Sequence, residues 1–207
     1  MSFAAAKEVG DGELFRIGTK CVKRISLADE RWRLWCDKEL EKKKEYWGAL
    51  RLHGFLTPEA FRVENFLFLI SPWVEGIDLY QWLESAPSKE EKEAVFTKIL
   101  DEFIRLEKTA FFHGDIHPGN IILGSGDIHF IDWTHAGKEG DRVWRSSPGF
   151  LAPERRVHAL LSSWSEIFSF GKLCEKIFGE QGNKHMERAC RPIPTQRFSS
   201  FQEMKGY

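Results

Sequence analysis

The chain has little of three features that mark large classes of proteins: clustered cysteine, charge of one sign, and long apolar runs. Its cysteines show no C-x-x-C spacing, which favours buried thiols over a zinc site or a disulfide framework. They are Cys21, Cys36, Cys174 and Cys190. The 30 basic and 31 acidic side chains give a formal charge of -1, so no global field favours nucleic acid or an anionic membrane.

Long apolar segments are also missing. No run approaches the roughly 20 residues of a membrane span, and residues 1–10 lack the apolar core of a signal peptide. We therefore expect a cytoplasmic protein with no transmembrane segment and no nucleic-acid partner. Of the 207 residues, 42% are hydrophobic and 29% charged, so the chain can bury a sizeable core as one domain or two small lobes.

What is present alternates between strand-like and helix-like segments. Residues 13–25 predict a hairpin with a tight turn at Gly18-Thr19, and the charged, Trp-dotted residues 28–52 predict one or two helices. The short apolar run 66–70 predicts a buried strand. A connector is expected over residues 71–76, before helices take over the second half of the chain.

The most informative stretch is HGDIHPGN at residues 113–120, followed by Ile131-Asp132-Trp133. It sets Asp115, Asn120 and Asp132 on two loops joined by a short apolar hairpin. A carboxylate can orient and deprotonate an attacking hydroxyl, while an amide oxygen and a second carboxylate can hold magnesium against phosphates. Phosphoryl transfer from ATP needs that set of groups. A polar turn between two strands is the other interpretation.

Five ordered motifs together resemble those of protein-kinase-like phosphotransferases. Residues 113–120 are similar to the catalytic-loop pattern HxDxxxxN, and Asp132 stands where that superfamily has its second magnesium-binding Asp. The other three are PGFLAPE at residues 148–154, similar to the end of an activation segment, SFG at residues 169–171, and QRFSS at residues 196–200.

The resemblance implies a single domain over residues 1–207 with an α+β, bilobal protein-kinase-like fold. Its parts would be a small strand-rich N-lobe over residues 1–70, a hinge over residues 71–78 and a mainly helical C-lobe over residues 79–207. It also implies ATP and Mg2+ as cofactors, with Asp115 as the catalytic base and Asn120 and Asp132 as metal ligands.

Other expectations concern the C-lobe alone. The resemblance implies that Arg197 pairs with Glu154, and Glu166 stands in place of the Asp that usually precedes the SFG-like motif. Trp144, Trp164 and Phe168 are expected to be packing aromatics of the core or lobe.

In the N-lobe, Lys23 follows an apolar residue on a predicted strand, as the lysine of the VAIK motif does. It is expected to reach the α- and β-phosphates of ATP, although a solvated strand lysine would look the same. Glu45 is its expected carboxylate partner, with Glu41 one turn earlier as the competitor. The run Lys42-Lys43-Lys44 is expected to be a solvated helix face.

A phosphate-cradling turn is expected at Gly10 and Gly12, whose backbone amides resemble part of a glycine-rich loop. The third glycine of such a loop is absent, with Phe15 near its place. A simple surface turn explains the same residues.

Residues 70–76 resemble the connector between the lobes of kinases. This places Ser71 at the back of the adenine pocket, with the Pro72 carbonyl and the Val74 amide as partners of the adenine ring. Asp78 is either an acceptor for a ribose hydroxyl or the N-cap of the next helix.

Several departures from the superfamily bear on substrate and regulation. Gly114 replaces the arginine that docks a phosphorylated activation segment in many protein kinases, so activation by loop phosphorylation is not expected. His117 replaces a phosphate-contacting lysine, which is similar to aminoglycoside, choline and lipopolysaccharide kinases. Trp133 and Thr134 replace the Phe and Gly of the DFG unit, which should hinder its flip.

The PGFLAPE platform is the feature that favours a protein acceptor, because protein kinases seat the substrate peptide on it. We therefore expect transfer of the γ-phosphate to Ser or Thr of a protein. A sugar, lipopolysaccharide or small-molecule hydroxyl is the alternative acceptor. The weak glycine-rich loop motivates a third hypothesis, a pseudokinase scaffold, against which stands the joint presence of Lys23, Asp115, Asn120 and Asp132.

Overall fold

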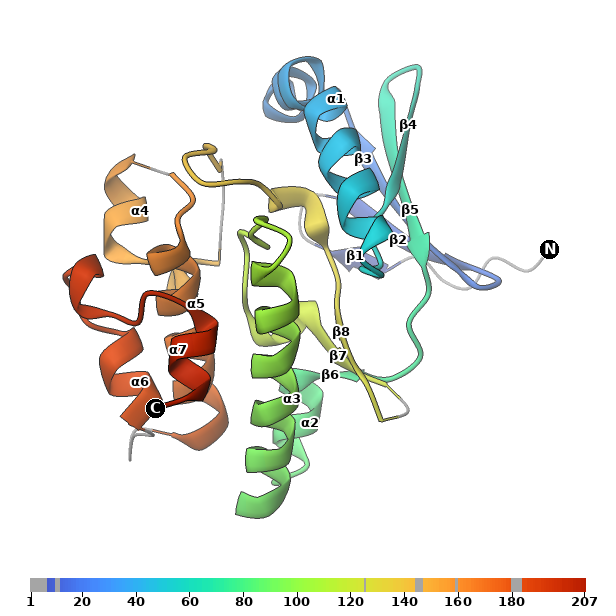
Figure 1. Cartoon of the computed structure of the whole chain (residues 1–207). Helices are drawn as coiled ribbons and strands as arrows, with labels where there is room; N and C mark the ends of the chain where they lie inside the picture. The colour runs from blue at the N-terminus through green and yellow to red at the C-terminus, as the bar shows by residue number, and fades with distance from the viewer. Residues whose placement is uncertain (1–6, 10–11, 125, 144–146, 159, 180–183) are drawn as a thin grey trace. The chain divides into compact units, whose positions relative to one another are not determined.

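The computed structural model describes residues 7–9, 12–124, 126–143, 147–158, 160–179 and 184–207. Its chain divides into two compact units, residues 1–74 and residues 75–207 (Figure 1).

The first unit is a five-stranded antiparallel sheet with one long helix. Its elements are β1 (Lys7–Val9), β2 (Gly12–Ile17), β3 (Lys20–Ser26), α1 (Glu30–Leu52), β4 (Glu59–Val63) and β5 (Phe66–Pro72). The strand order is β1-β2-β3-β5-β4, so β3 lies at the centre of the sheet. The predicted hairpin is confirmed, with Gly18 taking the positive φ of 59° that its tight turn needs.

Strand β5 is longer than the predicted 66–70. Ser71 and Pro72, which the sequence suggested to be connector, continue the strand and pair with Cys21 and Lys20 of β3. Proline is tolerated there because it is the last residue of the strand, where a missing N–H removes little of the ladder.

Helix α1 begins at the N-cap Asp29, whose side chain accepts a hydrogen bond from the Arg31 N–H. Its buried residues recur every three or four positions, as an amphipathic helix requires: Trp35, Cys36, Leu40, Lys43, Trp47 and Leu50. The expected solvated face of three lysines is therefore wrong at its middle member. Lys43 is only 3% exposed because it falls on the same face as Leu40 and Trp47.

The second unit is mainly helical. Its helices are α2 (Leu79–Glu84), α3 (Lys89–Glu107), α4 (Pro153–His158), α5 (Ser163–Phe178), α6 (Lys184–Ala189) and α7 (Phe201–Lys205). A small sheet is formed by β6 (Ile77–Asp78), β7 (Ile121–Leu123) and β8 (Ile128–Phe130). Short 3-10 turns cover Pro118–Asn120, Trp133–His135, Pro148–Phe150 and Pro194–Gln196.

An aromatic cluster joins the layers of this unit. Phe103 of α3 contacts Phe130 of β8 at a ring-centroid distance of 4.5 Å, and also contacts Phe170 of α5 and Phe201 of α7. Helix α3 thus lies between the small sheet and the helices α5 and α7, as Figure 1 shows. Aromatic contacts of this kind contribute beyond their buried area, so the cluster holds the β7–β8 hairpin firmly on the helical core.

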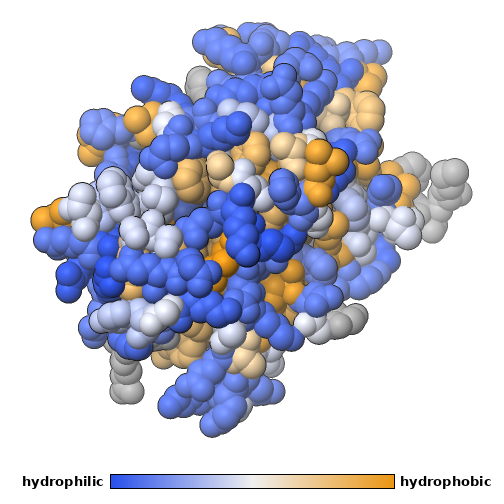
Figure 2. Space-filling view, viewed as in Figure 1, coloured by the Kyte–Doolittle hydropathy of each residue, from blue (hydrophilic) through white to orange (hydrophobic). Residues whose placement is uncertain are grey.

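The α+β fold class is confirmed, with a strand-rich first unit and a mainly helical second unit. Phe168 is buried as expected, Trp164 is partly exposed, and Trp144 lies outside the described residues. None of the helices in the described parts of the chain has both the length and the apolarity to cross a membrane. On the face seen in Figure 2, hydrophilic residues cover most of the coloured surface and apolar ones form small areas.

Candidate functional site

The loop 113–120 is anchored by the buried ring of His113. Its Nε2 lies 2.9 Å from the Ile131 carbonyl, and its Nδ1 lies 3.4 Å from the Asp115 N–H. Together these contacts require a neutral ring that donates from Nε2 and accepts at Nδ1. Desolvation lowers the pKa of His113, which favours the neutral form, although the nearby Asp115 opposes the shift.

Glu166 of α5 binds the backbone of the same loop. Its two carboxylate oxygens accept hydrogen bonds from the backbone N–H groups of His113, at 3.1 Å, and Gly114, at 2.9 Å. Burial raises the pKa of Glu166 to about 7, while Arg155 and the two N–H donors act against that rise. The Glu that replaces the usual Asp therefore binds the loop 113–120 directly.

Gly114 is required by the backbone at this point. Its φ is 81°, and a Cβ atom there would lie 2.3 Å from the His135 carbonyl oxygen. No arginine can occupy the position in this backbone. The Gly114 carbonyl accepts a hydrogen bond of 3.1 Å from Nη1 of Arg155, which comes from α4.

Asp115, the expected base, lies at the partly exposed end of the loop. Its Oδ1 accepts a hydrogen bond of 2.8 Å from the Ser147 N–H, and its Oδ2 lies 3.8 Å from Nε2 of His117. The Nδ1 of His117 accepts from the Gly119 N–H at 3.1 Å, which orients the ring towards Asp115. The carboxylate is thus oriented by its surroundings and keeps access to solvent.

Asn120 is oriented so that its amide oxygen is not used by the loop. Its Nδ2 donates to the Asp115 carbonyl at 2.9 Å, and its own backbone carbonyl accepts from the Ile131 N–H across the β7–β8 hairpin. This hairpin contact brings Asn120 beside the segment that carries Asp132.

Asp132 directly follows the end of the hairpin in a left-handed conformation, with φ 56° and ψ 65°. A non-glycine residue in this region costs free energy and is common at functional sites. Its Oδ1 accepts a hydrogen bond of 2.6 Å from the Thr134 hydroxyl. Trp133 is buried, with its ring 4.7 Å from His113 and its Nε1 bonded to the Phe130 carbonyl.

Asn120 and Asp132 supply the amide and carboxylate oxygens that Mg2+ prefers, and Mg2+ commonly takes only one or two protein ligands beside substrate phosphates. Among the described residues no cluster of three His, Cys, Asp or Glu side chains could hold a metal ion. The donor set therefore fits magnesium better than a fully protein-bound transition metal.

The predicted Glu154–Arg197 ion pair is confirmed. It is bidentate, with N–O distances of 2.7 and 2.9 Å, and the Arg197 side chain is fully buried. Arg197 also donates to the carbonyls of Arg191, Trp164 and Pro192. This network braces the segment that follows Ser147.

The first unit does not form the expected Lys23–Glu45 pair. Lys23 lies on β3 opposite Leu69 of β5, whereas the exposed side chain of Glu45 makes no ion pair or hydrogen bond with another described residue. The competitor Glu41 pairs with Lys44. The reason is helical periodicity: the inward position near Glu45 is occupied by Lys43 and Trp47.

The other candidate nucleotide contacts have local structural roles. Gly10 lies outside the described residues. Gly12 pairs with Val9, and a Cβ atom there would lie 2.6 Å from the Arg24 carbonyl oxygen, which alone explains the glycine. Asp78 is the N-cap of α2, accepting from the Gln81 N–H at 2.9 Å, so that interpretation is confirmed. Pro72 ends β5 and Val74 ends the first unit.

Sequence reasoning missed two residues that contact the loop, Arg155 and Ser147. The sequence indicates the burial of Arg155 only weakly, because Arg155 and Arg156 are adjacent residues of one type and nothing in the pattern distinguishes the buried one. Ser147 donates through its backbone N–H, which no side-chain pattern reveals.

Comparisons with known proteins find kinase-like sequences similar to this chain. A family model of the ABC1 atypical kinase-like domain matches residues 58–143, which contain both loops. The serine/threonine-protein kinase ppk6 of Schizosaccharomyces pombe is 35% identical over 121 residues, covering 55% of this chain and 16% of that protein. The KEOPS complex subunit Bud32 of Pyrococcus abyssi is 30% identical over 81 residues, covering 39% of this chain and 36% of that protein. The chain spans only a minor part of either relative.

Proposed function

We propose that the chain, which is similar to kinase-like proteins over residues 58–143 and to two curated relatives, transfers the γ-phosphoryl group of ATP to a hydroxyl acceptor with the help of Mg2+. The observation that carries the proposal is the interlocked loop pair in which Asp115, Asn120 and Asp132 are each oriented by backbone or side-chain hydrogen bonds. Fixed positioning of this kind supplies most of the catalysis of phosphoryl transfer.

In this proposal Asp115 orients the acceptor hydroxyl and takes its proton. Its Oδ1 is held by the Ser147 N–H, so Oδ2 is the oxygen that meets the acceptor. Asn120 Oδ1 and the carboxylate of Asp132 would hold Mg2+, which neutralises charge on the phosphates when bound. His117, whose Nε2 faces Asp115, would contact the transferred phosphate.

Residues of the first unit would bind the nucleotide. Lys23 is proposed to reach the α- and β-phosphates, and Gly10 and Gly12 to contribute backbone amides. The Pro72 carbonyl and the Val74 amide are proposed partners of adenine. Because Glu45 is exposed, its role as the partner of Lys23 would require a rotation or shift of α1.

Asp78 is proposed as a ribose contact only in addition to its capping role, since its Oδ1 already accepts from the Gln81 N–H. Its second carboxylate oxygen is the atom available for a ribose hydroxyl. A cytoplasmic location stays a prediction.

For the acceptor we favour Ser or Thr of a protein. The segment after Ser147 is joined to the catalytic base through the Ser147 N–H and braced by the Glu154–Arg197 pair, which suits a platform for a peptide beside Asp115. The name of the relative ppk6 points the same way. A sugar or small-molecule hydroxyl is the second candidate, favoured by His117 in the catalytic loop.

The decisive test of chemistry compares wild-type protein with Asp115→Ala in magnesium-dependent ATP turnover. Asp127→Ala is the matched control, because Asp127 is an exposed Asp on the turn of the same hairpin. We expect Asp115→Ala to lose several orders of magnitude in kcat and Asp127→Ala to match wild type. Wild-type turnover no greater than that of Asp115→Ala would support the pseudokinase hypothesis instead.

The acceptor class needs a separate experiment. The protein is incubated with γ-labelled ATP and a whole lysate, with Asp115→Ala in parallel, and macromolecular label is separated from lipid and small soluble label. Label on protein that depends on Asp115 supports the peptide acceptor. Label confined to sugar or lipid fractions would favour the second candidate.

A further inference from the structure

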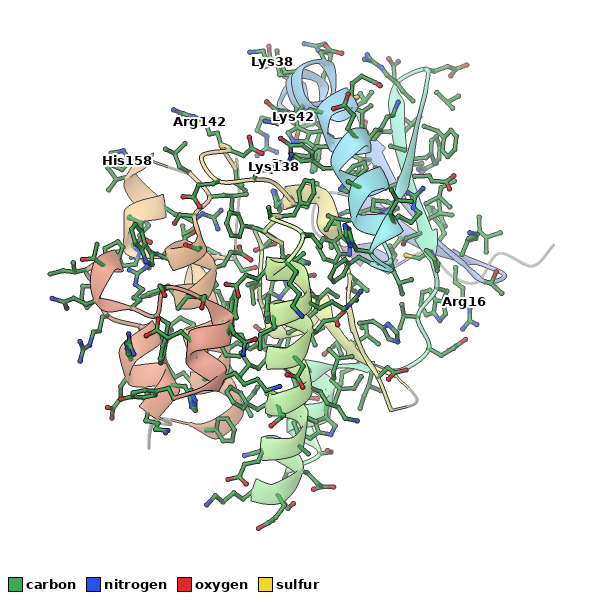
Figure 3. All side chains as sticks on the ribbon, viewed as in Figure 1. Arg16, Lys38, Lys42, Lys138, Arg142 and His158 are labelled. Carbon is green, nitrogen blue, oxygen red and sulfur yellow. The ribbon has the colours of Figure 1, made fainter. Side chains whose placement is uncertain are left out.

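Arg155 is a buried cation that the roles proposed above do not use. It lies on the short helix α4, is only 4% exposed, and is the one residue of that helix that is buried. Three other cationic or titratable side chains of the same unit, Lys138, Arg142 and His158, are exposed and are labelled in Figure 3. A guanidinium is costly to bury unless it meets an opposite charge or hydrogen-bond acceptors.

A hydrogen bond joins Arg155 to the loop that carries Asp115. Its Nη1 donates to the Gly114 carbonyl at 3.1 Å, while the Gly114 N–H donates to Glu166 at 2.9 Å. Both polar atoms of the Gly114 backbone are therefore taken up, one by a cation and one by a carboxylate. The peptide that precedes the catalytic Asp115 is held from two sides.

The charges of this cluster also balance. Desolvation lowers the pKa of Arg155. The negative charge of Glu166 is the largest effect that favours the charged form of Arg155, and Asp115 and Glu154 follow it. Burial raises the pKa of Glu166, and the charge of Arg155 is the largest effect that lowers it. Each of the two charges makes the burial of the other tolerable.

This arrangement reverses the one expected from the superfamily motif. There, an arginine in the catalytic loop reaches out to a phosphate on the activation segment. Here the loop position is Gly114, where a Cβ atom would clash with the His135 carbonyl, and the arginine comes from the segment instead. The same segment donates the Ser147 N–H to Asp115.

We propose that Arg155 is a positioning residue that ties residues 147–158 to the catalytic loop through the Gly114 carbonyl and balances the charge of Glu166, so that this link needs no phosphate. The kinetic part of this inference rests on the proposed function. The structural part, the holding of the Gly114 peptide, does not.

The test uses the full chain with Arg155→Met, Glu166→Gln and the double variant, and Arg156→Met as the matched control from the exposed face of the same helix. We expect Arg155→Met to lower kcat by about tenfold to a hundredfold, with the KM for ATP changed less than about twofold. Arg156→Met should match wild type. The double variant should lose less than the product of the two single losses, because both side chains hold the same Gly114 peptide.

Two further readouts separate positioning from packing. Arg155→Lys keeps the charge and should retain more activity than Arg155→Met, which also serves if the Met variant folds poorly. Phosphatase treatment of the wild-type protein should leave kcat unchanged. Losses that multiply in the double variant, a Lys variant no better than Met, or a phosphatase-sensitive kcat would each overturn the proposal.

Amide hydrogen exchange tests the structural part without any activity. In Arg155→Met the His113 and Gly114 amides should exchange at least about tenfold faster than in Arg156→Met, because the peptide loses one of its two anchors. If the wild-type protein turns over no ATP, the proposed function fails while this measurement still decides on Arg155. Equal exchange in the two variants would overturn the proposal.

Discussion

The two units of the chain hold their candidate site residues in different ways. In the second unit the side chains of Asp115, Asn120 and Asp132 are each oriented by a hydrogen bond to a neighbour in the loop pair or its supporting segment. In the first unit Lys23 and Pro72 lie on two different strands, β3 and β5, and Glu45 on α1 faces solvent. The residues proposed for the chemistry are thus held together within one unit, whereas those proposed for nucleotide binding lie on separate elements of the other.

The difference follows from the distances along the chain. The loop residues are five apart, or joined across a short hairpin, so local backbone hydrogen bonds are enough to bring them together. Lys23 and Glu45 are on a strand and a helix, and their meeting depends on the rotation of the whole helix about its axis.

The largest expected effect is that of removing a proposed metal ligand of the second unit. Asp132→Ala should abolish the saturable dependence of ATP turnover on magnesium and lower kcat by several orders of magnitude, because one of the two proposed metal ligands is lost. Magnesium titration of the initial rate, with Asp127→Ala as the control, measures this. An unchanged magnesium optimum in Asp132→Ala would contradict the assigned metal site.

The next effect concerns the stability of the second unit. Arg197→Met should lower the free energy of unfolding by about 3–5 kcal/mol, because it leaves Glu154 and three backbone carbonyls without their cation. Lys205→Met, which breaks the half-exposed pair with Asp101, should cost less than about 1 kcal/mol. Urea unfolding of both variants measures these changes. Equal losses in the free energy of unfolding would show that the buried Arg197 pair stabilises the protein no more than an exposed pair does.

A smaller effect tests the first unit. Lys23→Met should raise the KM for ATP and lower kcat/KM by about a hundredfold through loss of a phosphate contact. Glu45→Ala should stay within about twofold of wild type, since the exposed side chain of Glu45 makes no ion pair or hydrogen bond with another described residue. If Glu45→Ala is as damaging as Lys23→Met, the helix must rotate on nucleotide binding, and the contrast between the units would hold only without nucleotide.

The smallest expected effect is a dependence of stability on pH. Burial raises the pKa of Glu166 from 4.5 to about 7, so between these values the folded protein binds more protons than the unfolded chain. Its contribution to stability is therefore present at low pH and is lost as pH rises through 7. The opposite contribution of neutral His113 is lost as pH falls below its ordinary pKa of 6.5.

Urea unfolding of wild type and Glu166→Gln at pH 5, 6, 7 and 8 isolates this term, because His113 is present in both proteins. The free energy of unfolding of wild type minus that of the variant should fall by about 2 kcal/mol from pH 5 to pH 7. A difference that does not change with pH would mean that Glu166 has its ordinary pKa.

Much of the second unit could be predicted from the sequence because its signals are local. The loop motif and the alternation of strand and helix rest on residues whose type and spacing restrict their structure. The Glu154–Arg197 pair joins residues 43 apart and is expected only from the resemblance to kinases. Asp78 shows the limit of such reasoning. Its sequence context supports two roles equally, and only the hydrogen bond to the Gln81 N–H assigns the capping role.

The residues that could not be predicted are those whose environment is made by distant segments. Lys43 is buried because its helical position coincides with that of Leu40 and Trp47, a fact hidden inside a run of three lysines. Arg155 and Arg156 are neighbours of one type, yet only the first is buried.

By itself, the sequence determined which chemical groups stand in the two loops of the second unit, because motif spacing and hairpin geometry act over a few residues. The tertiary structure alone decided which cation and which carboxylate meet the Gly114 peptide, since Arg155 and Glu166 lie 41 and 52 residues away. Burial and the partnering of buried charge depend on which helices pack together, and neither is written in any short stretch of the chain.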